Sequence, residues 1–207
     1  ELILTPADAT NGGIMTTGAQ TFAGAKTFTN TVTFGTDITV NSIKIGMGGG
    51  NVFTNTAIGT GALATNSSGS GSTAFGYNAL NKSTAGYATA FGSGALEVLS
   101  SGTSNVAVGY TALNRITTQN SNTAIGDQSM RMNTGGNNTA LGASSLYGVS
   151  GQSTGINNTA LGTYAMKNAT TAASNVAAGS NSLYNLATGN DNTVLGYLSG
   201  YYAGAGT

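Results

Sequence analysis

The stretch NTAIGTGAL, residues 55–63, decides how this chain folds, because eight close copies of it follow before residue 201. The copies are STAFGYNAL (72–80), ATAFGSGAL (88–96), NVAVGYTAL (105–113), NTAIGDQSM (122–130), NTALGASSL (138–146), NTALGTYAM (158–166), NVAAGSNSL (175–183) and NTVLGYLSG (192–200). Each carries one glycine at the same place, and these glycines are Gly59, Gly76, Gly92, Gly109, Gly126, Gly142, Gly162, Gly179 and Gly196. Their spacing of 16, 17 or, once, 20 residues predicts a solenoid.

Within one unit, neither an alternating pattern nor a helical spacing continues beyond four or five residues, so short strands separated by turns fit best. We expect a strand at Thr56–Ile58, with Ala57 pointing one way and its two neighbours the other. Gly59 occupies a bend that needs a positive φ or a close backbone approach. Ala62 and Leu63 then start a second strand, and Leu63 enters the same narrow core as Ile58.

The segments between the motifs are rich in Ser, Asn and Gly and are expected to form the loops that return the chain. The single 20-residue gap places its extra residues in 148–156, within such a loop. At an interstrand spacing of about 4.8 Å, nine coils make a body on the order of 40 Å long. Asparagines one repeat apart then form a column whose side chains hydrogen-bond along it. The column consists of Asn55, Asn105, Asn122, Asn138, Asn158, Asn175 and Asn192.

The core of a single stack is expected to be thin, because each coil contributes only about two large apolar side chains and one or two alanines. Such burial scarcely offsets the entropy of ordering some 17 residues. Oligomerisation is the natural source of further burial. We therefore predict a parallel homotrimer in which the small residue of each strand approaches the shared axis or a neighbouring subunit. These residues are Ala57, Ala74, Ala90, Ala107, Ala124, Ala140, Ala160 and Ala177.

A different period precedes the solenoid, which is expected to span residues 55–207. Residues 1–20 are interpreted as a junction, and residues 21–45 repeat every six residues through Phe22, Phe28, Phe34 and Val40. An even period suits β-structure, so three chains are expected to meet here in a prism or an intertwined shaft. A single-chain hexapeptide β-helix is the competing interpretation. Residues 46–54 (GMGGGNVFT) are interpreted as a flexible hinge or a tight crossing.

Composition argues against several classes of function. Six acidic and six basic residues cancel, which disfavours binding to nucleic acid. No apolar run reaches the roughly 20 residues that span a bilayer, so we expect no membrane insertion. Without His or Cys, and with scattered carboxylates, no acid–base pair is suggested, so we expect no enzyme, no metal and no cofactor. The GMGGG run lacks the Lys-Ser/Thr and the helix of a phosphate-binding loop.

Aromatic residues divide into two groups by their place in the motif. Phe75 and Phe91 directly precede the motif glycine and are interpreted as core residues. Tyr77, Tyr110 and Tyr197 directly follow it and are the better surface candidates. Because an amphipathic ring with a polar tip suits a sugar, these three are possible glycan contacts, although ordinary packing is the simpler interpretation.

The units NTAIGTGAL, STAFGYNAL and NTALGASSL resemble the head repeats of trimeric autotransporter adhesins and, equally, the shafts of bacteriophage tail fibres. The stretch TTGAQTFAGAKTF (16–28), leading through VNSIKIGMGGGN (40–51), resembles the segment that precedes such repeats in tail-fibre and related surface proteins. The resemblance implies trimeric left-handed β-rolls, attachment to a host surface and often a C-terminal self-cleaving chaperone. Adhesin-head repeats are usually shorter than the 16 to 17 residues seen here.

Our leading hypothesis is therefore a structural fibre protein of a phage tail or phage-like particle, located in the virion. Its expected partners are copies of itself, other fibre or baseplate proteins, and a glycan or protein of the host surface. A bacterial cell-surface adhesin or extracellular filament subunit is the alternative. An ice-binding solenoid is a third possibility, because seven motif threonines form a column, although Val106 and Val176 interrupt it and no second threonine column accompanies it.

Overall fold

The computed structural model describes residues 25, 27, 29–34 and 36–202 of the chain. The chain divides into two compact units, Glu1–Phe34 and Gly35–Thr207. In the first unit, the described residues carry no helix or strand. Phe22 and Phe28, two of the four residues on which the predicted trimeric prism rests, and the whole 1–20 junction lie outside the described residues.

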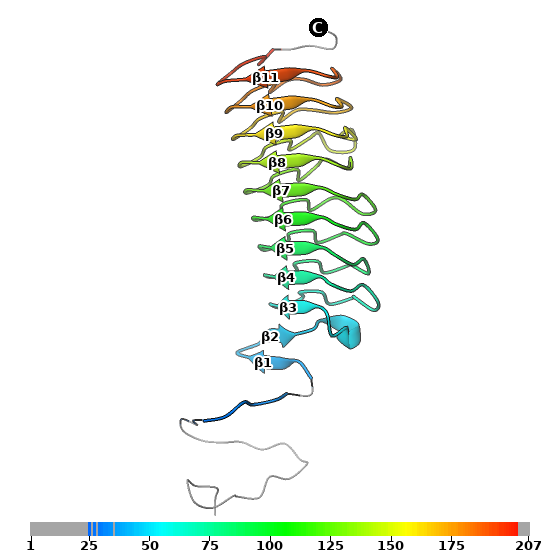
Figure 1. Cartoon of the computed structure of the whole chain (residues 1–207), viewed down its shortest axis with the longest axis vertical. Helices are drawn as coiled ribbons and strands as arrows, with labels where there is room; N and C mark the ends of the chain where they lie inside the picture. The colour runs from blue at the N-terminus through cyan, green and yellow to red at the C-terminus, as the bar shows by residue number, and fades with distance from the viewer. Residues whose placement is uncertain (1–24, 26, 28, 35, 203–207) are drawn as a thin grey trace, which may run out of the picture. The chain divides into compact units, whose positions relative to one another are not determined.

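The second unit is a parallel β-solenoid, which confirms the predicted fold class (Figure 1). Nine three-residue strands stack in chain order, and every pairing between them is parallel and in register. The strands are β3 Thr56–Ile58, β4 Thr73–Phe75, β5 Thr89–Phe91, β6 Val106–Val108, β7 Thr123–Ile125, β8 Thr139–Leu141, β9 Thr159–Leu161, β10 Val176–Ala178 and β11 Thr193–Leu195. Nine strands enclose about eight complete turns, against the nine coils counted in the sequence.

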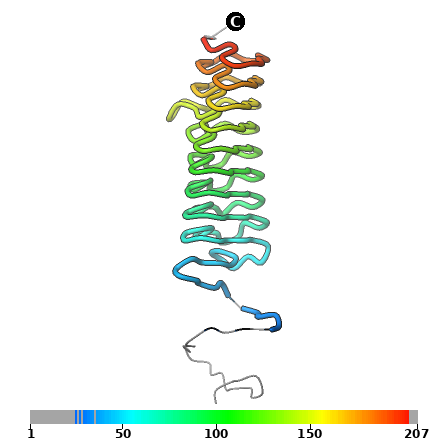
Figure 2. Tube along the Cα trace, turned by 90° about the vertical axis from the view of Figure 1, so that its left-hand side faces the viewer, coloured from blue at the N-terminus to red at the C-terminus, as the bar shows by residue number. Residues whose placement is uncertain are grey.

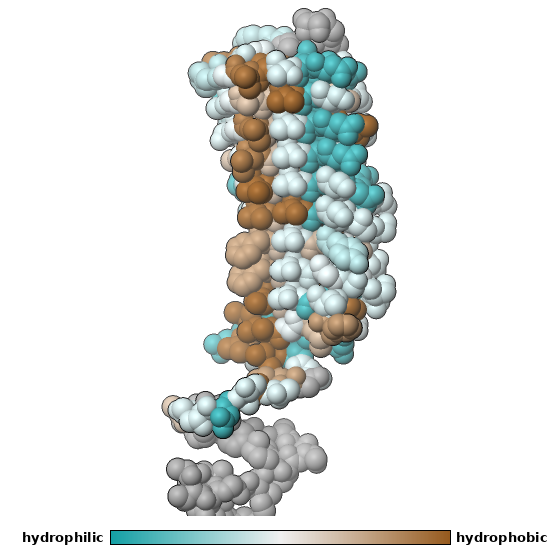
Figure 3. Space-filling model, viewed as in Figure 1, coloured by the Kyte–Doolittle hydropathy of each residue, from teal (hydrophilic) through white to brown (hydrophobic). Residues whose placement is uncertain are grey.

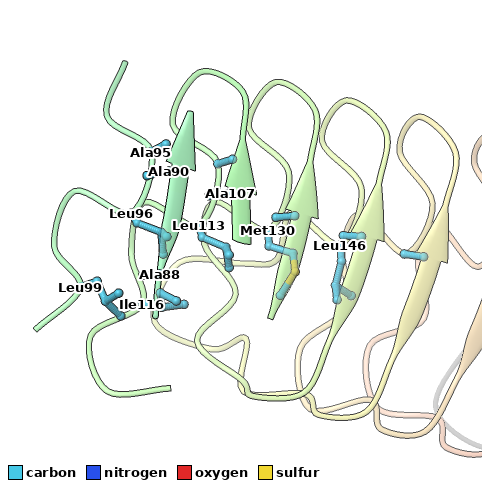
Figure 4. Close-up of a cluster of buried hydrophobic side chains, with 14 of the residues drawn as sticks. Ala88, Ala90, Ala95, Leu96, Leu99, Ala107, Leu113, Ile116, Met130 and Leu146 are labelled. Atoms are coloured by element: carbon cyan, nitrogen blue, oxygen red, sulfur yellow. The ribbon is translucent and has the colours of Figure 1, made fainter. Parts of the chain in front are cut away.

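Strands β3 to β10 alternate as predicted, with the central residue buried and the outer two facing out, and in the last strand, β11, the central Val194 is partly buried. The buried central residue, such as Ala107, packs with the motif leucine or methionine, such as Leu113, inside the coil (Figure 4). Apolar residues of the return loop, Leu99, Ile116 and Leu186, close the other side of this core. Each coil therefore fills its interior with side chains of its own chain.

Two predictions about the core are wrong. The residue before the motif glycine does not enter the core: Phe75 is 43% exposed and Phe91 is 52% exposed. The strand alanines do not approach a trimer axis, because Ala74 and Ala90 are fully buried within their own chain. Both errors have one cause. Adjacent residues of a strand point to opposite faces, so an inward alanine forces the following large residue outward.

The predicted second strand at Ala62–Leu63 is also wrong, because this segment is a series of tight turns. The Ala62 N–H donates to the Gly59 carbonyl at 3.2 Å, while the Leu63 N–H donates to Ala79 of the next coil at 3.0 Å. Leu63 has φ 47°, in the left-handed region, and the equivalent Leu80 has φ 50°. This conformation turns the leucine side chain into the core within two residues of the bend, which a strand would not do.

The predicted asparagine column is a buried hydrogen-bond ladder. The Asn122 Oδ1 atom accepts from the Asn138 backbone N–H at 2.9 Å, and its Nδ2 donates to the Gly135 carbonyl at 3.1 Å. The Asn138 Oδ1 accepts in turn from the Asn158 N–H at 2.9 Å. Each side chain thus satisfies two backbone groups that a short strand leaves unpaired. Ser72 and Ala88 replace asparagine in the second and third coils.

The three residues that lengthen one repeat form an outward turn, as the loop assignment predicted. The turn at Ser150–Gln152 projects from the side of the solenoid (Figure 2). The register of the coils on either side is unchanged, because β8 and β9 still pair residue for residue. An insertion on the solvent side of a solenoid therefore leaves its stack intact.

The first coil is preceded by an antiparallel hairpin. Strands β1 (Ile38–Val40) and β2 (Ile43–Gly46) pair with each other, and β2 pairs antiparallel with β3. Residues 38–45, which the six-residue period groups with the N-terminal shaft, thus belong to the solenoid sheet. The single 3-10 helix of the described residues, η1 (Gly49–Asn51), follows.

At its centre, the glycine-rich segment 46–54 forms a tight crossing and not a flexible hinge. Gly48 is buried with φ 80°, and a Cβ atom there would lie 2.6 Å from the Leu63 Cβ. The Gly49 N–H donates to the Leu63 carbonyl at 2.8 Å. Glycine therefore lets the backbone itself cover the open end of the first core layer.

Candidate functional site

The outward face of the stacked strands carries two parallel columns of side chains (Figure 3). The first, which we call the apolar ladder, consists of Ile58, Phe75, Phe91, Val108, Ile125, Leu141, Leu161, Ala178 and Leu195. The second, the threonine ladder, consists of Thr56, Thr73, Thr89, Val106, Thr123, Thr139, Thr159, Val176 and Thr193. Neither ladder contains a charged residue. In Figure 3 the apolar ladder is the brown stripe that runs along the solenoid.

The apolar ladder is far more exposed than a row of such residues usually is. Leu141 is 49% exposed and Leu195 is 71% exposed. Phe75 and Phe91 stack on each other, with ring centroids 4.7 Å apart and planes within 7°. Because the strands pair in register, the side chains repeat at the strand spacing and the face is flat and regular. A continuous exposed apolar stripe of this length indicates an interaction surface.

The motif glycines maintain the stacking next to this face. Gly126 has φ 135°, and a Cβ atom there would lie 2.5 Å from the carbonyl oxygen of Gly142 in the next coil. The other motif glycines from Gly59 to Gly179 repeat the pattern, with φ between 126° and 142°, whereas Gly196 in the last coil has φ 112° and no backbone atom close to its Cβ position. Both reasons for glycine that the sequence suggested, a positive φ and a close backbone approach, therefore apply at the same position. These residues are structural and offer no side chain to a ligand.

The three tyrosines singled out as glycan contacts lie in one column on the surface, but the structure does not bring them together. Tyr77, Tyr110 and Tyr197 are 60%, 58% and 72% exposed. Tyr77 and Tyr110 follow β4 and β6, so one coil separates them, and Tyr197 follows β11. They form no ring contacts with one another. The three rings therefore do not form a single platform, and their role as glycan contacts stays a prediction.

Few residues of the chain are charged, and the fold brings one oppositely charged pair of side chains into contact. The Lys44 Nζ lies 2.8 Å from the Asp37 Oδ2, and the Asp37 Oδ1 accepts from the Met47 N–H at 2.7 Å. Burial raises the pKa of Asp37, but the ion pair with Lys44 and the backbone N–H groups lower it more, so that the pKa lies below its ordinary value. This pair fastens the hairpin to the turn before η1.

Residues 36–202 contain no cluster of metal-ligating side chains. No set of three acidic, histidine or cysteine side chains lies close enough there to hold a metal ion. In the same part of the chain, no helix has the length and apolar character to cross a membrane. The stacked strands present one regular face along the solenoid.

Comparisons of the chain with protein-family models, with curated proteins and with solved structures find no match.

Proposed function

We propose that this chain is a structural shaft protein of a phage tail fibre or a phage-like particle, in which parallel copies of the chain share the apolar ladder. The observation that carries the proposal is the uncharged apolar ladder along the flat sheet face. Exposure of an apolar stripe of this kind to water is unfavourable in free energy, so we expect another surface to bury it.

The exposed part of the ladder suits an interface. Six of its nine side chains are large and 37% to 71% exposed: Phe75, Phe91, Ile125, Leu141, Leu161 and Leu195. Full burial of a large apolar side chain stabilises by about 1.5–3 kcal/mol, so covering six that are roughly half exposed gains on the order of 5–9 kcal/mol. The threonine ladder lies beside them on the same face.

Another copy of the chain is the partner that fits this face best. The rungs repeat at the strand spacing over nine strands. Only a surface with the same spacing keeps every rung opposite a rung, and another copy of the chain has that spacing in either orientation. The parallel orientation follows from the resemblance to trimeric fibre shafts. Three copies around an axis bring three apolar ladders together. This replaces the expectation that the strand alanines line the axis, since Ala74 and Ala90 are buried in their own coil.

The role in attachment rests on this architecture together with the resemblance to tail-fibre shafts. A rod whose apolar face lies inside the assembly exposes loops on its outside, where they can meet fibre or baseplate proteins and the host surface. The virion is then its location. A bacterial cell-surface adhesin or extracellular filament uses the same assembly, and the genomic neighbourhood of the coding sequence distinguishes these two.

The test is the mass of the chain in solution, measured by light scattering coupled to gel filtration. Three chains of 20.3 kDa give 60.9 kDa (3 × 20.3). The variant Leu141→Lys places a charge in the middle of the apolar ladder and is expected to yield a 20.3 kDa species. The matched control, Ser101→Lys, adds the same charge at an exposed loop residue and is expected to keep the mass of the assembly. A wild-type mass of 20.3 kDa contradicts the proposal.

A second function is favoured by one observation, the exposed threonine ladder. Thr73, Thr89 and Thr139 are exposed on the flat face at the strand spacing, as recognition of an ice lattice requires. Ice binding needs this face free, whereas the shaft covers it. A monomeric mass together with thermal hysteresis supports ice binding, and an assembled chain without hysteresis supports the shaft.

A further inference from the structure

Most of the basic residues lie on one edge of the solenoid. This edge is formed by the two residues that come directly after the ninth motif position in each coil. Two neighbouring columns of residues form this edge, and backbone hydrogen bonds between coils hold them in register. The Lys82 N–H donates to the Glu97 carbonyl at 3.1 Å, and the Met132 N–H donates to the Tyr147 carbonyl at 2.8 Å. The first column is Ala64, Asn81, Glu97, Asn114, Arg131, Tyr147, Lys167, Tyr184 and Tyr201. The second is Thr65, Lys82, Val98, Arg115, Met132, Gly148, Asn168, Asn185 and Tyr202. We call these two columns the basic edge.

Four cations on this edge have no carboxylate partner within the described residues. They are Lys82, Arg115, Arg131 and Lys167. The ion pair found in residues 36–202 joins Lys44 to Asp37, away from the edge. The one carboxylate of the two columns, Glu97, accepts instead from the side-chain amides of Asn78 at 3.4 Å and Asn114 at 3.1 Å.

One more acidic residue lies close to the edge without neutralising it. The Asp127 carboxylate accepts from Gln128 Nε2 at 3.1 Å, and the Gln128 Oε1 accepts from Arg131 Nη1 at 3.2 Å. An amide therefore separates the carboxylate from the guanidinium. With four cations and the Glu97 carboxylate, the two columns of the basic edge carry a net charge of +3 (4 − 1) on a chain whose net charge is zero.

The cations are spaced along the axis like a row of contacts for an extended polyanion. Lys82, Arg115, Arg131 and Lys167 follow β4, β6, β7 and β9, so they lie two, one and two coils apart. At about 4.8 Å per coil the row is roughly 24 Å long. A linear chain of anionic groups that runs parallel to the solenoid can reach all four.

Tyrosines hold two of these cations in place. The Arg131 Nη1 donates to the Tyr147 hydroxyl at 3.4 Å. The Lys167 Nζ lies 4.6 Å from the centre of the Tyr164 ring and 5.6 Å from that of Tyr184. Cations held in this way lose less entropy when an anion binds. The phenol groups add donors and acceptors for hydroxyl groups of a ligand.

We propose that the basic edge binds a linear acidic polysaccharide along the solenoid axis, with its carboxylates or sulfates on the four cations and its hydroxyls on the tyrosine hydroxyls. The rings favour a polysaccharide over a single-stranded nucleic acid. Tyr184 and Tyr201 stack on each other with centroids 4.9 Å apart, and Lys167 covers the ring of Tyr164, so one face of each of these rings is occupied, while Tyr202 at the C-terminal end of the edge is 86% exposed. Bases need free ring faces for stacking, whereas anionic groups and hydroxyls need only the cations and the ring edges.

This inference names the class of ligand for the proposed attachment role. It rests on that role only in taking the ligand to be a glycan of a host surface. The basic edge shares no residue with the apolar ladder. Loss of binding and loss of assembly are therefore separate results.

The experiment is isothermal titration calorimetry of the whole chain with polygalacturonate and with dextran sulfate, which distinguish carboxylate from sulfate. Uncharged dextran and poly(dT) are the comparison ligands. We expect binding of at least one acidic polysaccharide at low salt, weakening as salt rises, and none of dextran. The double variant Arg131→Gln/Lys167→Gln is expected to lose about tenfold in affinity, or about 1.4 kcal/mol.

The control is Lys44→Gln, which removes one positive charge away from the edge and is expected to keep the affinity. Light scattering on every variant verifies that the assembly is unchanged. The proposal is overturned if neither acidic polysaccharide binds, if poly(dT) binds as tightly, or if the double variant keeps wild-type affinity. A loss in Lys44→Gln equal to that of the double variant also overturns it, since net charge rather than the edge then determines binding.

Discussion

Replacing Asn122 by alanine tests whether the buried asparagine ladder holds adjacent coils together. In the native coil, the Asn122 side chain accepts from the Asn138 N–H at 2.9 Å and donates to the Gly135 carbonyl at 3.1 Å. Asn122, Asn138 and Gly135 are all buried, so water does not replace the lost partners. An unsatisfied buried group costs about 1–3 kcal/mol, so two such groups predict a loss of about 2–6 kcal/mol.

The assay is urea unfolding followed by circular dichroism at one protein concentration, combined with amide hydrogen exchange. The exchange of the Asn138 N–H is expected to accelerate more than that of amides two coils away. The internal control is Asn192→Ala in the same column, because within residues 36–202 the Asn192 Oδ1 accepts no hydrogen bond. A loss below about 0.5 kcal/mol for Asn122→Ala, with the Asn138 amide still protected, refutes the reasoning.

The reciprocal change is Ala88→Asn. Ala88 occupies the same column but offers no acceptor to the next coil, and the backbone N–H of Asn105 is the group that an asparagine there would meet. We expect a gain of about 1 kcal/mol from the added hydrogen bonds. A loss of stability would mean that the third coil has no room for the larger side chain.

Two further predictions concern backbone geometry and pH. Gly126→Ala is expected to lower the free energy of unfolding by at least about 3 kcal/mol, because its Cβ atom would lie 2.5 Å from the Gly142 oxygen. Gly151→Ala, with nothing within 4 Å of its Cβ position, is expected to lower it by only about 1 kcal/mol through left-handed strain. Equal losses for the two variants in urea unfolding contradict the steric argument. The lowered pKa of Asp37 stabilises the hairpin above the unfolded pKa of about 3.9, and this contribution disappears as pH falls through the folded value. The melting-temperature difference between wild type and Asp37→Asn should therefore shrink below pH 4, and a difference that is constant from pH 6 to pH 2 disproves the linkage.

The repeat and its outward loops were predictable because they depend on sequence period alone. The glycines mark one bend per coil, and the asparagine column follows from stacking residues one repeat apart. The alternation of Thr56, Ala57 and Ile58 also follows from strand geometry.

The two faces of the strand were harder to assign, since the large residue was expected inside and the small one at a shared axis. The position of Leu63 determines which residues of the strand face the core. It joins Ala57 in the core by taking φ 47°, a conformation for which leucine gives no sequence signal, because Gly and Asn are the usual left-handed residues. With the leucine supplying bulk to the core, the strand needs only alanine there, and Ile58 is left on the outside.

The central claim is that copies of the chain meet through the apolar ladder in parallel register, and cross-linking through a single cysteine tests it most directly. The chain has no cysteine, so Leu141→Cys introduces the only thiol. We predict that a short bis-maleimide joins two Leu141→Cys chains into a 40.6 kDa species (2 × 20.3) on a denaturing gel, whereas Ser101→Cys on the loop side gives none. A Leu141→Cys chain that stays at 20.3 kDa, or one that cross-links no better than Ser101→Cys, contradicts the claim.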